Sequence, residues 1–166
     1  MLVTVVDDTD GPQLLLTRRS WGLRDHRGEV SFPGGGRDPD DIDLVMTALR
    51  EAREEVGLDP RHVRVIGELD HLVTVSSDRF VVPVVGVTSS IEGLVAQPSE
   101  VEAILVVPVA RLLAPGVHHE EIWRREIDGV TIEHPIHFFD IPGDIIWGAT
   151  AAMIHQLFEL VLADDG

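Results

Sequence analysis

The sequence predicts a layered α/β fold with a mixed sheet, built as a single domain over residues 1–166. Two observations favour this fold. Short segments rich in Val, Leu and Ile recur between turn residues, and two longer segments carry apolar residues at helical spacing. No repeat or linker divides the chain, and its length suits one complete hydrophobic core.

The first part of the chain predicts two strands, a glycine-rich loop and a helix. Residues 2–6 and 13–17 have the composition of strands and are separated by an acidic turn. Residues 34–36 are three consecutive glycines, which exclude a regular element and let the backbone approach a ligand closely. Residues 43–56 predict a helix that stops at Gly57.

The predicted helix is amphipathic. Its apolar residues are Ile42, Val45, Met46, Leu49, Ala52 and Val56. At about 100° per residue, most of them fall on one stripe. Glu51, Glu54 and Glu55 stand at positions i, i+3 and i+4. We therefore expect the helix to bury one face and to present these three carboxylates on the other.

The rest of the chain predicts three strands, a short helix, a hairpin and a long helix. In chain order these are strands at residues 63–69, 80–87 and 104–107, a short helix at 108–113, a hairpin of residues 122–127 and 131–139 that turns at Asp128-Gly129, and a helix at 145–162. His118 and His119 are expected to be a solvated loop pair, since no third metal ligand stands at recognisable spacing.

Composition excludes several classes of function. The net charge is −16, which argues against general nucleic-acid binding and against an anionic membrane surface. No apolar run approaches the roughly 18 residues of a membrane span. The absence of cysteine excludes disulfides and thiol catalysis, and the N-terminus lacks a basic leader, so we expect a cytoplasmic protein.

All 13 basic residues are arginine, and five of them are concentrated in one segment. Residues 18–37 contain Arg18, Arg19, Arg24, Arg27 and Arg37 but only two acidic residues, a local charge of +3. A basic segment in an acidic chain fits a specific anionic ligand, and it also fits a scatter of solvated arginines.

The three glutamates of the predicted helix allow two interpretations. Charged helix faces are usually exposed to solvent, and Arg50 and Arg53 stand at the spacing for pairing with the glutamates. Alternatively, three mutually repelling carboxylates are a set of hard oxygen ligands that suits Mg²⁺ or Mn²⁺. The glycine-rich loop just before the helix favours a ligand site.

The loop and the helix together resemble the signature motif of the Nudix hydrolase family. The motif is carried by FPGG at residues 32–35 and REAREEVGL at residues 50–58, and the second segment matches the family at every fixed position. The first half departs from the motif, because Ile42 stands where the family has Glu. Asp41, one residue earlier, is a candidate replacement. The resemblance implies a Nudix-type α/β/α sandwich.

A second resemblance is narrower and points to the coenzyme A diphosphatase branch of that family. Its main motif begins with LLTRRS at residues 15–20 and continues with Arg24, Gly28 and FPGG at residues 32–35, each separated from the preceding feature by three residues. Residues 83–86, 99–101 and 146–151 also resemble that branch. That branch also tends to carry the one-residue shift seen at Asp41. The similarity covers nearly the whole chain.

The resemblance implies a metal-dependent mechanism. Glu51, Glu54 and Glu55 hold Mg²⁺ or Mn²⁺, and a bound water attacks phosphorus. Arg50 orients the glutamates, and the resemblance assigns catalytic roles to Glu54 and Arg50. Glu100 is either an extra metal ligand or general base, or an ordinary exposed glutamate.

The resemblance also implies the substrate. Substrate contacts are assigned to Arg18, Arg19, Arg24, Gly34 and Gly35, with coenzyme A or acyl-coenzyme A as substrate and 4′-phosphopantetheine and adenosine 3′,5′-bisphosphate as products. Two alternatives remain: a Nudix diphosphatase for another nucleotide such as ADP-ribose or NADH, and a non-catalytic nucleotide-binding domain. Dimers are common in the family, so a homodimer is also compatible with the resemblance.

Overall fold

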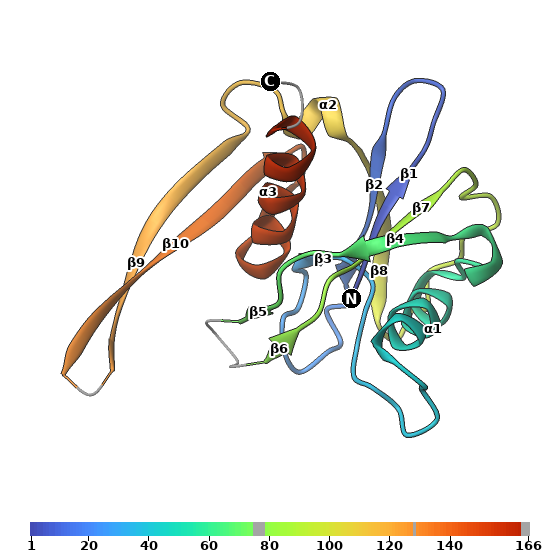
Figure 1. The fold of residues 1–166 in the computed structure, drawn as a ribbon, viewed down its shortest axis with the longest axis horizontal. Coiled ribbons are helices and arrows are strands. Elements are labelled where there is room, and N and C mark those ends of the chain that lie inside the picture. Colours follow the sequence, from blue (N-terminus) through green and yellow to red (C-terminus); the bar gives the residue numbers. More distant parts are fainter. Residues whose placement is uncertain (75–78, 128, 164–166) are drawn as a thin grey trace.

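A six-stranded mixed sheet organises the computed structural model, which describes residues 1–74, 79–127 and 129–163 (Figure 1). Its strands are β1 (Leu2–Val6), β2 (Gln13–Arg19), β3 (Val30–Ser31), β4 (Arg64–Glu68), β7 (Val84–Thr88) and β8 (Val101–Pro108). The order is β3-β2-β1-β7-β4, and β8 also pairs with β2. β1 and β7 run parallel, whereas the other pairs are antiparallel.

Two helices cover opposite faces of this sheet, α1 (Leu44–Val56) and α3 (Gly148–Leu162) (Figure 1). The alternation of side chains along β2 divides the core between them. Leu14 and Leu16 belong to the cluster that contains Met153 of α3, whereas Leu15 packs with the α1 residues around Ala52. The predicted α/β layered fold with a mixed sheet is confirmed.

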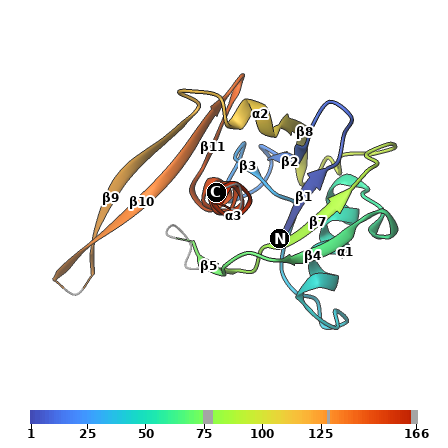
Figure 2. The same cartoon turned by 45° about the horizontal axis from the view of Figure 1, so that its top comes forward.

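The remaining elements lie beside the sheet. β9 (His118–Ile127), β10 (Val130–Ile141) and β11 (Asp144–Trp147) form an antiparallel sheet, and the β9–β10 hairpin extends away from the rest of the molecule (Figures 1 and 2). The smaller elements are β5 (Leu72–Val73), β6 (Phe80–Val81), α2 (Val109–Leu112) and a 3₁₀ turn (Pro60–His62). No described helix has both the length and the apolar character needed to span a membrane.

Three predictions about the elements are wrong. The single strand expected at 80–87 is two strands, because Pro83 has no N–H to donate to a ladder. The helix expected at 145–162 begins only at Gly148, because residues 144–147 pair with β10. His118 and His119 lie in β9 rather than in a loop. Of the predicted hairpin turn, Asp128 lies outside the described residues.

Candidate active site

Helix α1 positions the candidate metal ligands. Asp43 caps its first turn by accepting a backbone N–H at 2.7 Å, and Gly57 ends the helix with a left-handed backbone at φ 72°. These two signals were readable in the sequence, and they fix the helix almost where it was predicted. Glu51, Glu54 and Glu55 consequently lie in its last two turns.

The three glutamates differ strongly in burial. At about 100° per residue, Glu55 lies about 60° around the helix from buried Ala52, Glu51 about 100° and Glu54 about 160°. Accordingly Glu55 is only 4% exposed, whereas the side chains of Glu51 and Glu54 are 13% and 57% exposed. The expectation that all three face away from the core is therefore wrong for Glu55. Met46, expected in the apolar stripe, is exposed instead.

Arg50 connects the glutamates to the loop before the helix. Its Nη1 donates to Glu51 at 3.0 Å and to Glu54 at 2.9 Å, and its Nη2 donates to the carbonyl of Gly36 at 2.9 Å. Its strongest partner is Asp41, which accepts from Nε at 3.1 Å and from Nη2 at 3.0 Å. These charge-assisted bonds raise the pKa of Arg50 and fix its guanidinium between the two elements.

Asp41, rather than residue 42, points into this network. Asp41 is 2% exposed, and besides Arg50 it accepts hydrogen bonds from the hydroxyl of Thr47 and the N–H of Asp38, both at 2.9 Å. The hydrogen bonds from Arg50 hold the pKa of Asp41 well below its usual range. Ile42 is 82% exposed. The loop therefore turns the carboxylate one residue earlier in the chain towards Arg50.

The glycine loop lies directly against the carboxylates. The N–H of Gly34 donates to Glu55 at 3.2 Å. A Cβ at Gly35 would lie 2.6 Å from the carboxylate of Glu51, whereas a Cβ at Gly36 would meet nothing within 4 Å. Gly35 is thus needed for close approach of the backbone to Glu51.

The charge of this cluster suits a divalent cation. Burial raises the pKa of Glu55 to about 7, and the neighbouring charges of Glu51 and Glu100 add to this rise, while the Gly34 N–H and Arg19 oppose it. Burial also raises the pKa of Glu51. A nearby cation would stabilise the ionised form of these two carboxylates, which burial disfavours. Carboxylate oxygens are also the ligands that Mg²⁺ and Mn²⁺ prefer.

Binding by all three glutamates at once requires some rearrangement. Among the described residues, no three acidic side chains bring oxygens within 4.8 Å of one another. Glu54 is 57% exposed, so exchanging its hydrogen bond with Arg50 would let its side chain turn towards Glu51 and Glu55 without disturbing the core.

The two adjacent arginines of β2 point to opposite faces of the sheet. Arg18 lies on the α3 side and forms a two-point ion pair with Asp144 of β11, with distances of 2.7 and 2.6 Å. Arg19 lies on the α1 side, near enough to Glu55 to influence its pKa. The Nε of Arg19 is buried and has no hydrogen-bond partner in the described part of the chain. Arg24 is exposed in the loop that follows.

Glu100 lies at the edge of the same cluster. Its carbonyl accepts the N–H of Ser20 at 2.8 Å, which ties its loop to the end of β2, and its charge raises the pKa of Glu51 and Glu55. Glu100 itself is exposed. It is therefore placed near the carboxylates, on the solvent side.

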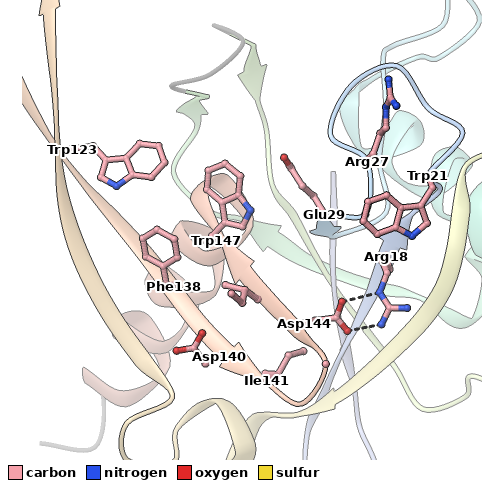
Figure 3. Close-up of a pocket in the computed structure, with 13 residues that line it drawn as sticks. Arg18, Trp21, Arg27, Glu29, Trp123, Phe138, Asp140, Ile141, Asp144 and Trp147 are labelled. Atoms are coloured by element: carbon pink, nitrogen blue, oxygen red, sulfur yellow. Dashed lines mark hydrogen bonds and ion pairs between the residues drawn. The ribbon is translucent and has the colours of Figure 1, made fainter.

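An aromatic cavity lies on the other side of the Arg-rich loop (Figure 3). Trp21 and Arg27 line it from the loop, and Trp123, Phe138 and Trp147 line it from the hairpin and β11. Trp21 lies against the backbone of Gly28, where an added Cβ would come within 2.5 Å of its ring. None of the three glutamates lines this cavity, so it is separate from the carboxylate cluster. Trp123 and Phe138 could not be predicted from the sequence, because their position across the cavity from the loop depends on where the hairpin folds.

Comparisons with known proteins agree with this geometry. The family model of the NUDIX domain matches residues 2–126. An uncharacterized Nudix hydrolase, NudL of Photorhabdus laumondii, is 41% identical over 151 residues, covering 90% of this chain and 78% of that protein. NudL of Yersinia pestis is 39% identical over 150 residues, covering 90% of this chain and 73% of that protein.

Solved structures share the fold. A MutT/nudix family protein from Enterococcus faecalis covers 98% of this chain and 60% of its own, with a TM-score of 0.63 and 18% identity. The NUDIX domain of Shewanella oneidensis NrtR, solved with ADP ribose, covers 66% of this chain and 70% of its own, with a TM-score of 0.51 and 22% identity.

Proposed function

Because the chain belongs to the Nudix hydrolase family, and is thus a hydrolase acting on phosphorus-containing anhydrides, we propose that it cleaves the diphosphate bond of coenzyme A or acyl-coenzyme A in the presence of Mg²⁺ or Mn²⁺. Water is consumed, and the products are 4′-phosphopantetheine and adenosine 3′,5′-bisphosphate. The observation that carries the proposal is the cluster of Glu51, Glu54 and Glu55, joined by Arg50 to a glycine loop.

The glutamate cluster is the proposed metal site. Glu51, Glu54 and Glu55 would hold the ion, which when bound supplies charge neutralisation and an activated water at phosphorus. Arg50 keeps Glu51 and Glu54 in place through charge-assisted hydrogen bonds. Glu100 is the proposed proton acceptor for the attacking water, because it lies beside the cluster and faces solvent.

The arginines and the glycine loop are the proposed phosphate contacts. Gly34 and Gly35 let the diphosphate approach the carboxylates, and the Nε of Arg19 has no hydrogen-bond partner among the described residues. Arg24 is exposed in the loop that follows β2 and is proposed to bind the 3′-phosphate. Arg18 is engaged with Asp144, so a substrate contact there requires that this ion pair exchange.

The aromatic cavity is the proposed site for the adenine ring. Trp21, Trp123 and Trp147 offer flat faces for stacking, and Arg27 adds a positive charge. Arg18 and Arg27 line the cavity and Arg19 lies near Glu55, so arginines of one segment reach both sites, as a ligand with an aromatic base and several phosphates requires.

A Glu54→Gln variant tests the reaction. We expect it to lower the Mg²⁺-dependent release of adenosine 3′,5′-bisphosphate from coenzyme A by at least about 100-fold, because it removes one charged ligand. Glu92→Gln, which changes an exposed glutamate outside α1, serves as the matched control and should keep wild-type activity. Product release is measured by chromatography. Equal activity of both variants would contradict the assignment.

A second candidate is a diphosphatase for another nucleotide, such as ADP-ribose, the ligand solved with the Shewanella oneidensis domain. Comparing kcat/KM for coenzyme A with kcat/KM for its form without the 3′-phosphate distinguishes the two candidate functions. A kcat/KM at least about tenfold higher for coenzyme A supports the first proposal. Equal values for both compounds, with faster turnover of ADP-ribose, support the second.

A further inference from the structure

Three histidines from three different elements meet at the base of the β9–β10 hairpin. His118 belongs to β9, His137 to β10 and His155 to α3. One ring nitrogen of each lies within 4.8 Å of the others, and in the described part of the chain no other three His, Asp or Glu side chains converge in this way.

The spacing of these nitrogens is close to that of metal ligands. The Nε2 of His118 lies 3.1 Å from the Nδ1 of His137. Two nitrogens bound to a tetrahedral zinc ion at about 2.0–2.1 Å lie about 3.3–3.4 Å apart. His155 places one ring nitrogen within 4.8 Å of these two, and its ring stacks on that of His137 with centroids 4.0 Å apart.

Two glutamates flank the histidines. A carboxylate oxygen of Glu120 lies 3.7 Å from the Nδ1 of His137, and one of Glu159 lies 3.6 Å from the Nδ1 of His155. Glu120 lies beside the same Nδ1 of His137 that faces His118, so it can serve as a fourth ligand. Glu159 can orient His155 by accepting the Nδ1–H of its ring while the Nε2 binds the ion. Three neutral imidazoles and two carboxylates give a charge that suits a divalent cation.

The surrounding packing holds the rings in place. The ring of His118 lies 4.8 Å from that of Phe139, and the side chains of His137 and His155 are only 14% and 32% exposed. Strand pairing of Phe139 with His118 fixes the register of the two hairpin strands, and α3 packs against β10. The site is therefore largely formed without a ligand.

We propose that His118, His137 and His155 bind a divalent transition-metal ion such as Zn²⁺, at a site separate from the glutamates of α1. Imidazole nitrogens suit Zn²⁺, Cu²⁺ and Ni²⁺, whereas Mg²⁺ requires oxygen ligands, so the two sites select different ions. The ion ties the β9–β10 hairpin to α3. The same hairpin carries Trp123 and Phe138 into the aromatic cavity, so the ion stabilises one wall of that cavity.

Titration of the full chain with Zn²⁺ in excess Mg²⁺ tests the proposal. Calorimetry should show one Zn²⁺ per chain, and Co²⁺ should give the visible absorption of a tetrahedral nitrogen site. His118→Gln should weaken Zn²⁺ binding by at least about 100-fold, since loss of even an outer-shell partner costs about 10–100-fold. His118 is exposed, so this variant is expected to fold, which circular dichroism checks; His155→Gln repeats the test from α3.

Matched variants separate this site from others. His134→Gln changes another histidine of β10 that is outside the cluster, and Glu54→Gln changes the glutamate site; both should bind Zn²⁺ like the wild type. The proposal is overturned if the wild type shows no saturable Zn²⁺ binding, or if folded His118→Gln binds as tightly. Loss of Zn²⁺ binding in Glu54→Gln would also overturn it. None of these outcomes depends on turnover of coenzyme A.

Discussion

Asp41 accepts hydrogen bonds from Arg50, although it stands one residue before the position at which the family motif has a glutamate. Asp41 is a candidate replacement for the glutamate missing at position 42, but the order of residues alone does not distinguish a displaced ligand from an ordinary loop aspartate. The decision depends on the path of the backbone, which buries Asp41 against Thr47 and leaves Ile42 82% exposed.

Asp41→Asn should lower kcat on the diphosphate substrate by about tenfold or more, because it removes the charge that holds Arg50 against the glutamates. Ile42→Ala is the control and should behave like the wild type, since the Ile42 side chain faces solvent. Steady-state rates with saturating Mg²⁺ provide the measurement. If Ile42→Ala proves the more damaging change, the assignment of Asp41 is wrong.

We expect the ionisation of Glu55 to make the stability of the metal-free protein depend on pH. Its pKa is raised by burial from 4.5 to about 7, so between these values the folded state binds more protons than the unfolded state. The free energy of unfolding therefore falls as the pH rises from about 4.5 to 7. Glu55→Gln should remove this decrease, and Mg²⁺ should offset it in the wild type.

Thermal unfolding of both proteins between pH 5 and about 8 in a chelating buffer provides the measurement. We expect the Glu55→Gln variant to become more stable relative to the wild type as the pH rises. Parallel curves would show that the ionisation of Glu55 is not disfavoured in the folded state.

At the scale of elements, local signals predicted most of the fold. The helix before Gly57 is present, and so are the strands around residues 2–6, 13–17, 63–69 and 104–107. The patterns that predict them, namely the spacing of apolar residues and the helix caps, involve only residues close in sequence. The strand β11 before α3 was missed for a different reason. Ile145, Ile146 and Trp147 continue the apolar pattern of the helix, and only pairing with β10 makes them extended.

The glycine loop offers a matched pair of substitutions. Gly35→Ala should lower activity by about tenfold or more while leaving the melting temperature nearly unchanged, because its Cβ would displace the flexible carboxylate of Glu51 rather than the backbone. Gly36→Ala should be nearly neutral, since its Cβ meets nothing within 4 Å. Equal activity of the two variants would show that the position of Glu51 does not matter.

At the scale of the whole molecule, the sites depend on contacts between distant segments. The motif residues 34–55 are close in sequence, so their cluster could be predicted. The aromatic cavity unites Trp21 with Trp123 and Trp147, and the histidine cluster unites residues 118, 137 and 155. No local pattern encodes these contacts, which is why His118 was expected to lie in a solvated loop.

The proposed substrate is tested most directly by competition. Coenzyme A, ADP-ribose and NADH at equal concentration are mixed with the wild-type chain and Mg²⁺, and their consumption is followed in one reaction, so that the relative rates report the ratios of kcat/KM. We expect coenzyme A to be consumed first and adenosine 3′,5′-bisphosphate to accumulate. Consumption of ADP-ribose or NADH while coenzyme A stays intact would contradict it.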